Sequence, residues 1–123
     1  MLQLCRLAGI RTIAVASDDK KLELCKGFGA TYTINYKTIT NFSEKVAAYT
    51  DAKGVDIITD PVLASHFAEN MKCLGMDCRW IIFGSLGGTK VKEANLVNLL
   101  LKRATIISST LKSRDDIYKT QLV

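Results

Sequence analysis

Arg79–Gly88 has the sequence RWIIFGSLGG, in which a short apolar run of β-forming residues leads directly into a glycine-rich turn. The run itself predicts a strand over Arg79–Phe83. Runs of this kind, without polar alternation, are typical of strands that are covered on both faces. Strands of the same character are predicted over Thr12–Ala16, Thr31–Asn35, Val55–Asp60 and Thr105–Thr110.

Segments with helical features separate these runs. Ser65–Leu74 places three apolar residues on one helical face. Because strand and helix alternate along the chain with short loops between them, the sequence predicts a single α/β unit with a parallel sheet and helices on both faces. The other predicted helices cover Met1–Ala8, run from Asp18 and Asp19 to Gly29, extend from Asn41 through Tyr49, cover Ala94–Arg103, and begin at Ser113.

Composition argues against several classes of protein. The formal net charge of +5 comes from scattered lysines and arginines, with no basic block of the kind that binds nucleic acid. No apolar run is long enough to cross a bilayer, so no membrane partner is expected. We expect reduced thiols of a cytoplasmic protein and no zinc site. The chain has one histidine, His66, and four cysteines without a CxxC pair: Cys5, Cys25, Cys73 and Cys78.

The first candidate site lies just after the strand that ends at Ala16, because ligands of open parallel sheets bind beyond the carboxyl ends of the strands. Ser17 follows this strand, and Lys21 lies one turn into the next helix. A carboxylate at the strand tip would hold the ribose hydroxyls of NAD, and its absence leaves room for a 2′-phosphate that a lysine can neutralise. The alternative is that Lys20 and Lys21 form a solvated helix face.

Two more strand ends carry candidate residues. The ring of Tyr36 can pack on an adenine, or its hydroxyl can bind a phosphate; the alternative is that it covers the sheet edge. After Phe83, Gly84 admits a flat cofactor ring close to the backbone and Ser85 can hydrogen bond to a carboxamide. The alternative is a plain glycine turn between a strand and a helix.

No catalytic residue and no metal ligand is predicted in the chain. Asp60, which Pro61 follows, has no second carboxylate or histidine spaced to pair with it, so a structural turn is expected there. His66 is expected at the start of a helix, not as a ligand or a base. The GxGxxG fingerprint of dinucleotide-binding loops does not occur.

Several stretches, taken in order, resemble the zeta-crystallin-like quinone oxidoreductases. These are zinc-independent members of the medium-chain dehydrogenase/reductase superfamily, and the likeness is greatest to their p53-inducible subgroup. It is collinear and spans essentially all 123 residues. The stretches are LAG at Leu7–Gly9, KKL at Lys20–Leu22, GFGAT at Gly27–Thr31, INYK at Ile34–Lys37, GVDIITD at Gly54–Asp60, CLGMDCRWIIFGSLGG at Cys73–Gly88, LLLKRATIISSTLKSRD at Leu99–Asp115 and the closing YKTQLV.

The resemblance implies roles for the candidate residues. It assigns Lys21 to the 2′-phosphate of NADPH, Tyr36 to a cofactor contact, and Phe83–Ser85 to the segment beside the nicotinamide. Ser17, also a cofactor-binding candidate, lies where the family often has Gly, and Asp18 lies where Ser or Thr is usual. An acid at Asp18 would repel a 2′-phosphate, so NADH remains an alternative to NADPH.

The family pattern also includes segments that are not found in this sequence. A first strand and a glycine-rich phosphate loop would precede Met1, and that strand would lie between the strands at Thr12 and Val55. We therefore expect a truncated, partial Rossmann domain over residues 1–123, without a catalytic domain. In the family the strand Thr105–Thr110 pairs with its mate, which implies a homodimer.

The implied function is hydride transfer from NADPH to a quinone or another activated carbonyl, with this chain as the cofactor-binding part. One alternative is a non-catalytic fragment or interaction module with weak or no dinucleotide binding. Another is a Rossmann module of a different class, such as a methyltransferase core; Ala16 argues against it, because such cores carry an acidic ribose ligand at that position. Pro61–Ala64 differs from the small, glycine-containing loop that is usual in the family.

Overall fold

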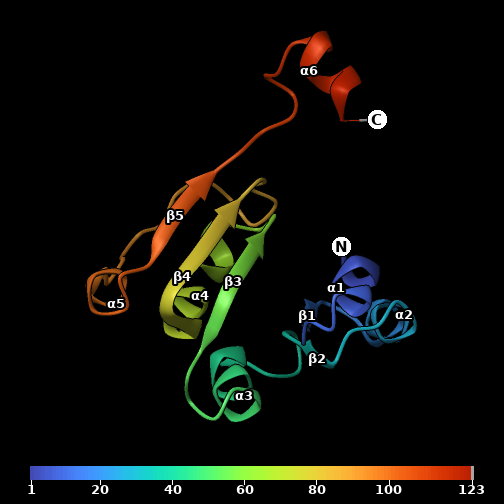
Figure 1. Ribbon diagram of the computed structural model, residues 1–123. Coiled ribbons are helices and arrows are strands. Elements are labelled where there is room, and N and C mark those ends of the chain that lie inside the picture. Colours follow the sequence, from blue (N-terminus) through green and yellow to red (C-terminus); the bar gives the residue numbers. More distant parts are fainter. Residues whose placement is uncertain (123) are drawn as a thin grey trace. The chain divides into compact units, whose positions relative to one another are not determined.

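The computed structural model describes residues 1–122, which belong to two compact units (Figure 1). Unit 1 comprises Met1–Lys53, and unit 2 comprises Gly54–Val123. Each unit contains its own parallel sheet, with two strands in unit 1 and three strands in unit 2. The predicted α/β class with parallel strands and flanking helices is confirmed, but the strands lie in two sheets where one was predicted.

Unit 1 is built around one pair of parallel strands. In this pair Ile13 lies opposite Tyr32 and Ala16 opposite Asn35. Because the strands are parallel and are joined by a helix, both end at the same edge of the sheet. The elements are α1 (Leu2–Leu7), β1 (Ile13–Ala16), α2 (Asp19–Gly27), β2 (Tyr32–Asn35) and α3 (Phe42–Tyr49).

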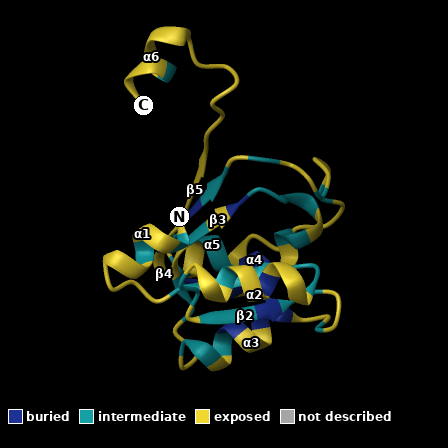
Figure 2. Cartoon of the chain, turned by 90° about the vertical axis from the view of Figure 1, so that its right-hand side faces the viewer, coloured by how far each residue is buried: buried dark blue, intermediate teal, exposed yellow. Residues whose placement is uncertain are grey.

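The core of unit 1 lies where α2 and α3 pack against this sheet. Figure 2 shows buried stretches on β2 and α3. The rings of Tyr32 and Tyr49 stack with their centroids 4.2 Å apart, which joins β2 to the end of α3. The buried apolar side chains of this core are Leu22, Ile34, Phe42 and Val46.

Unit 2 is a three-stranded sheet in the order β3-β4-β5, with all neighbours parallel. A 3-10 helix and α4 connect the first two strands, and α5 connects the second to the third (Figure 1). The elements are β3 (Val55–Asp60), η1 (Ala64–His66), α4 (Phe67–Cys73), β4 (Leu74–Ile82), α5 (Val97–Leu101), β5 (Thr105–Ser108) and α6 (Asp116–Gln121).

Trp80 is at the centre of the core of unit 2. It is fully buried on β4, and the centroid of its ring lies 4.9 Å from the centroid of the Phe67 ring on α4. Met71, Leu74 and Cys78 complete the buried cluster. Burial of these large side chains against each other supplies the main stabilisation of the three-stranded sheet.

Strand β4 begins at Leu74, whereas the sequence predicted a start at Arg79. The chain passes from α4 directly into β4. On the neighbouring strand β3, the pairing register with β4 shifts between Val55 and Ile57, because β4 accommodates extra residues there. Asp77 lies in this bulge with a positive φ of 58°. A bulge of this kind cannot be recognised from apolar periodicity, which explains the missed segment.

A bidentate ion pair fixes the bulge to the turn after α5. Arg103 donates from Nε to Asp77 Oδ1 (2.8 Å) and from Nη2 to Asp77 Oδ2 (2.7 Å). The Asp77 amide also donates to the Lys102 carbonyl oxygen at 2.7 Å. The hydrogen bonds from Arg103 lower the pKa of the Asp77 carboxyl, so this acid stays ionised at neutral pH.

The other predicted elements are recovered with shifted ends. The predicted helix Ser65–Leu74 is divided into η1 and α4, and Ala94–Arg103 is helical only over Val97–Leu101. The last helix begins at Asp116 rather than near Ser113, because the Asp115 carboxylate caps it by accepting the Tyr118 amide at 2.7 Å. Such offsets are expected at helix ends.

All four cysteines are free thiols. Cys73 and Cys78 are buried, and Cys5 and Cys25 are half-buried. Burial raises the pKa of the Cys73 thiol to about 12 and also raises that of Cys78, so both are protonated and unreactive in the folded unit. Among residues 1–122, no helix combines the length and the apolar character that crossing a membrane requires.

Candidate functional site

Three of the predicted cofactor residues lie at the carboxyl edge of the unit 1 sheet. Ser17 directly follows β1, Lys21 lies in the first turns of α2, and Tyr36 directly follows β2. The Tyr36 amide donates to the Ala16 carbonyl oxygen at 3.0 Å, which ties the end of one strand to the end of the other. The structure therefore brings Ser17, Lys21 and Tyr36 to one edge, as the sequence predicted.

Asp18 determines the local geometry of this edge. It is the N-cap of α2, in extended conformation, and its Oδ1 accepts the Lys21 amide at 3.0 Å. This arrangement satisfies one of the free amides at the helix start. The hydrogen bond from the Lys21 amide is the main cause that lowers the pKa of Asp18, and the Lys21 charge adds to it. Asp18 is therefore ionised at neutral pH.

The Lys21 ammonium group lies between Ser17 and Asp18. Its Nζ donates to Ser17 Oγ at 3.4 Å and lies 3.6 Å from Asp18 Oδ2. The Lys21 side chain is 63% exposed, so an anion from solvent can reach the ammonium. Nearby, Asn35 Nδ2 donates to Asp19 Oδ1 at 2.8 Å, which connects β2 to the first turn of α2.

The second candidate cluster lies in unit 2, where the loop after β3 runs beside the glycine-rich turn after β4. The Leu86 amide donates to the Pro61 carbonyl oxygen (3.0 Å) and the Gly87 amide to that of Val62 (2.8 Å). In return, the Ala64 amide donates to a carbonyl oxygen of the turn, that of Gly88 (3.2 Å). The two loops are thus paired backbone to backbone.

This pairing explains two glycines of the turn. A Cβ on Gly84 would approach the Pro61 carbonyl oxygen to 2.7 Å, and a Cβ on Gly87 would meet Ser65 Oγ and come within 2.7 Å of Val62 Cγ1. Packing of the protein on itself therefore requires both glycines. Phe83 and Ser85 are exposed beside them, so their side chains are accessible at this edge.

A buried carboxylate, Asp60, holds the loop after β3. Its Oδ1 accepts the amides of Val62 (2.7 Å) and Leu63 (2.9 Å), and its Oδ2 accepts Asn70 Nδ2 and Trp80 Nε1, both at 3.0 Å. Asp60 is only 3% exposed. The prediction that Asp60 has a structural turn role is confirmed, and its further links to α4 and β4 were not predicted.

Leu63 adopts a backbone conformation that normally requires glycine, with φ of 65° and ψ of −105°. The two bonds from the Val62 and Leu63 amides to Asp60 impose it. Such a conformation costs a non-glycine residue on the order of 1–3 kcal/mol. Asp60 thus holds this loop in a strained form.

His66 ends η1 just before α4, as the sequence predicted. Burial lowers the pKa of its imidazole, while the charge of Asp60 opposes this shift. The imidazole is therefore uncharged at neutral pH. Among the described residues, no group of three or more His, Cys, Asp or Glu side chains could hold a metal ion.

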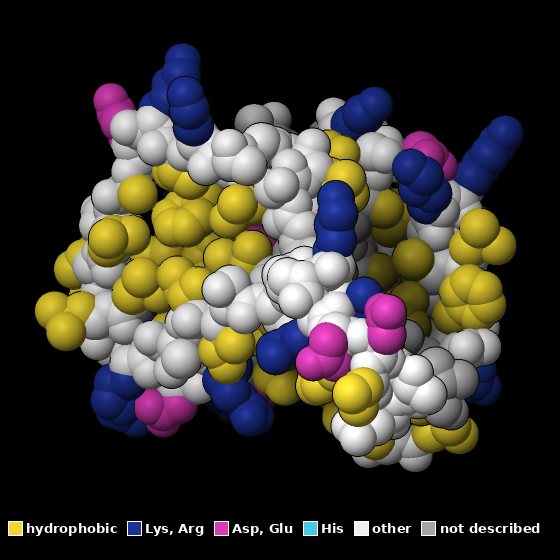
Figure 3. Space-filling view, turned by 90° about the horizontal axis from the view of Figure 1, so that it is seen from above, with side chains coloured by type: hydrophobic (Ala, Val, Ile, Leu, Met, Phe, Trp, Pro, Cys, Tyr) yellow, Lys and Arg dark blue, Asp and Glu magenta, His cyan; other side chains and the backbone are white. Residues whose placement is uncertain are grey.

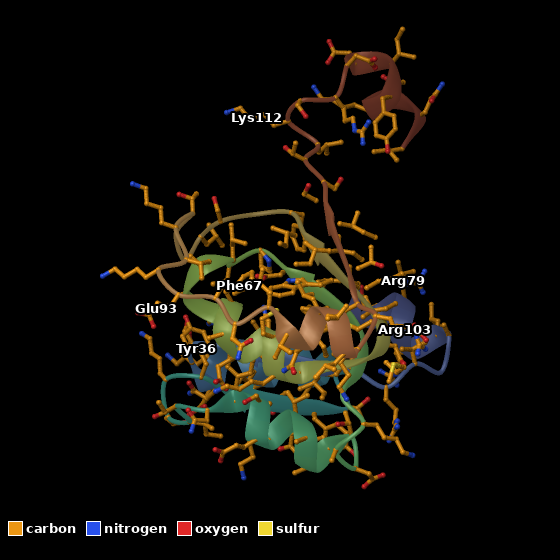
Figure 4. The ribbon with its side chains drawn as sticks, turned by 90° about the vertical axis from the view of Figure 1, so that its left-hand side faces the viewer. Tyr36, Phe67, Arg79, Glu93, Arg103 and Lys112 are labelled. Atoms are coloured by element: carbon orange, nitrogen blue, oxygen red, sulfur yellow. The ribbon has the colours of Figure 1, made fainter. Side chains whose placement is uncertain are left out.

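Unit 2 also contains a hollow that the sequence did not indicate. It has a volume of about 530 Å³ and lies between α4 and the segment 93–98, with Phe67 and Met71 on one side and Glu93 and Asn95 on the other (Figure 4). On the face seen in Figure 3, the Lys and Arg side chains stand in separate small groups.

The chain matches the family model of the zinc-binding dehydrogenases over residues 1–122, and it belongs to this family. It is a family of nicotinamide dinucleotide-binding dehydrogenase domains. Human quinone oxidoreductase is 26% identical over 111 residues, which cover 90% of this chain and 32% of that protein. Quinone oxidoreductase-like protein 2 of Bos taurus is 32% identical over 96 residues, which cover 77% of this chain and 27% of that protein.

Solved structures of dehydrogenases and reductases also resemble this chain. An NAD-dependent alcohol dehydrogenase has a TM-score of 0.81 at 27% identity over 97% of this chain and 34% of its own. A 2-haloacrylate reductase has a TM-score of 0.75 at 25% identity over 97% of this chain and 35% of its own. The predicted likeness to quinone oxidoreductases and the Rossmann-like fold are thus confirmed. The chain spans about a third of the length of these relatives.

Removal of the Asp60 carboxylate is expected to destabilise unit 2 severely. In Asp60→Ala, Trp80 Nε1 and Asn70 Nδ2 lose their partner, and unsatisfied buried donors of this kind cost on the order of 1–3 kcal/mol each. We predict a loss of about 3 kcal/mol in the free energy of unfolding, measured by urea denaturation. Asp56→Ala, on an exposed position of the same strand, is the control. A loss below about 1 kcal/mol in Asp60→Ala would contradict the assigned role.

The strain at Leu63 can be measured by comparing two truncations. Leu63→Gly and Leu63→Ala both remove the leucine side chain, but only glycine adopts the observed φ and ψ without strain. Leu63→Gly is therefore expected to be more stable than Leu63→Ala by about 1 kcal/mol, the reverse of the usual order. Equal stabilities, or a more stable alanine variant, would show that the backbone at this position is not strained.

Proposed function

We propose that the chain is the cofactor-binding part of an NADPH-dependent quinone oxidoreductase, which transfers hydride to a quinone or another activated carbonyl. The observation that carries the proposal is the gathering of Ser17, Lys21 and Tyr36 at one sheet edge, with an exposed ammonium group among them. The quinone oxidoreductases among the relatives support the substrate class. NADH is the alternative cofactor, and the location is proposed to be cytoplasmic.

The dinucleotide, when bound, supplies the hydride, and the residues of this chain bind and orient it. Lys21 binds the 2′-phosphate as a point charge, and Ser17 adds a hydroxyl beside it. Tyr36 is half-buried at the same edge and would supply an aromatic ring and a hydroxyl as further contacts. No residue of this chain is proposed as a catalytic acid or base.

Phe83, Gly84 and Ser85 are proposed to lie beside the nicotinamide. The support is the family resemblance, together with the exposure of Phe83 and Ser85 and the rigid backbone of this turn. The Phe83 amide donates to the Asp60 carbonyl oxygen at 3.0 Å, and the Gly88 amide donates to that of Ser85, also at 3.0 Å. A turn held in this way keeps its backbone in one arrangement, which favours binding of a flat ring.

A homodimer through the strand predicted over Thr105–Thr110 is also proposed. All four residues of β5 are exposed, and within the described residues this strand pairs with β4 alone (Figure 1). An unpaired strand edge favours addition of another strand, here that of a second copy.

A second candidate function is a module with weak or no dinucleotide binding. Two observations favour it: Asp18 already lies beside the Lys21 ammonium, and Gly84 and Gly87 are explained by packing within the protein. The two functions differ in whether the dinucleotide binds this chain at micromolar concentration.

A titration with NADPH, followed by the fluorescence of the reduced nicotinamide, tests the proposal. Saturable binding is expected, and Lys21→Ala should weaken it about tenfold, because an exposed charge-assisted contact of this strength is lost. Lys20→Ala is the matched control, since Lys20 is an exposed neighbour on the same helix. Absence of saturable binding, or equal losses in both variants, would contradict the proposed role of Lys21.

A further inference from the structure

We propose that the segment after β5, residues 110–122, packs on helix α5 of a second copy of this chain. This segment, which includes α6, is called the arm. The inference rests on the proposed function, because it needs the dimer through β5 that is proposed there. It goes further, since it gives a partner surface to a segment that the strand pairing itself does not involve.

The arm makes its described polar contacts within itself. The Asp115 carboxylate caps α6, and Asp116 pairs with Lys119 at 3.4 Å. The Arg114 guanidinium carbon lies 4.8 Å from the centroid of the Tyr118 ring. Figure 1 shows the arm leading away from the end of β5. An isolated helix as short as the six residues of α6 is unstable in water, so a further surface is needed to keep it folded.

The two sides of α6 differ in character. With about 100° between successive residues of a helix, Ile117, Tyr118 and Leu122 fall on one side. The ion pair between Asp116 and Lys119 falls on the other side. Ile117 is 74% exposed and Leu122 is 61% exposed. An apolar side of this kind is typical of a helix that packs on a partner surface.

Helix α5 carries a matching apolar surface near the start of β5. Leu100 is 79% exposed and Leu101 is 63% exposed. Leu99 packs on the core of unit 2 instead, so the core does not use the two exposed leucines. A short turn leads from α5 to Thr105, the first residue of β5. The exposed leucines therefore lie near the start of this strand, whereas the arm leaves from its end (Figure 1).

Antiparallel pairing of two β5 strands brings these surfaces together. A twofold axis perpendicular to the sheet reverses the strand direction, so the end of each strand lies beside the start of the other. The arm that follows Ser108 in one copy is therefore delivered to the partner's turn before Thr105, next to the exposed leucines of α5 there. Within one chain, the same two surfaces are separated by the length of β5.

The arm also supplies contact area that the strand pair lacks. Stable interfaces bury about 1,200–2,000 Å² in total. Each β5 has only four residues, so its pairing supplies only part of this area. Two arms, each packed on the α5 of the other copy, extend the contact on both sides of the strand pair. A second copy is therefore the occupant that fits the exposed side of α5.

Two substitutions on opposite sides of the proposed contact test the inference. Ile117→Asp changes the arm, and Leu101→Lys changes α5. Leu24→Lys is the matched control, because Leu24 on α2 is also 63% exposed. The dissociation constant of the dimer is measured by sedimentation velocity for the full chain, for each variant, and for an equimolar mixture of Ile117→Asp with Leu101→Lys. Urea unfolding verifies that each protein is folded.

Each of the two substitutions is expected to raise the dissociation constant of the dimer about tenfold or more, because it occurs twice in a symmetric dimer. Leu24→Lys should have no effect. The mixture should regain a dissociation constant near that of the unchanged chain. In a mixed dimer, one contact joins the new aspartate to the new lysine, and the other contact is unchanged.

Three results would overturn the inference. If Ile117→Asp dimerises as well as the unchanged chain, the arm is not part of the interface, and the dimer through β5 stands without it. If both single variants are weakened but their mixture does not recover, the arm packs within its own chain. If the unchanged chain is a monomer at high micromolar concentration, the proposed dimer fails as well, while the proposed cofactor binding is tested separately by the NADPH titration.

Discussion

The arrangement of unit 2 depends on one buried carboxylate. Asp60 accepts hydrogen bonds from two loop amides, from Asn70 on α4 and from Trp80 on β4. A carboxylate this deeply buried is tolerable only when its oxygens are fully hydrogen-bonded, and here donors from three parts of the chain meet that need. The same bonds hold Leu63 in a strained backbone conformation, so the Asp60 carboxylate determines the shape of the loop.

The paired loops after β3 and β4 follow from this arrangement. Because Asp60 fixes Pro61–Leu63, the glycine-rich turn can pack directly on that segment, and glycine becomes necessary at Gly84 and Gly87. In unit 1 a carboxylate also shapes the edge of a sheet, but Asp18 is half-exposed and pairs with Lys21. The acid of unit 2 is therefore buried and determines the shape of a loop, whereas the acid of unit 1 is half-exposed and caps a helix.

Much of the fold could be predicted from the sequence, because the five apolar β-rich runs are local signals. The candidate residues then follow from the rule that ligands of parallel sheets bind beyond the carboxyl ends of the strands. That rule selected Ser17, Lys21 and Tyr36 as candidate residues just after their strands. The bulge at Asp77 and the partners of Asp60 depend on contacts between distant segments, which periodicity does not contain. Nothing in a leucine signals the positive φ at Leu63, although an aspartate before Pro61 does indicate a turn.

The central proposal, that this chain binds a nicotinamide dinucleotide, is tested most directly by residue-resolved NMR. Amide spectra of the ¹⁵N-labelled chain would be recorded during a titration with NADPH. The account predicts that the amides which shift are those of Ser17–Lys21, Tyr36 and Phe83–Ser85. An unchanged spectrum, or shifts confined to the hollow between α4 and the segment 93–98, would contradict it.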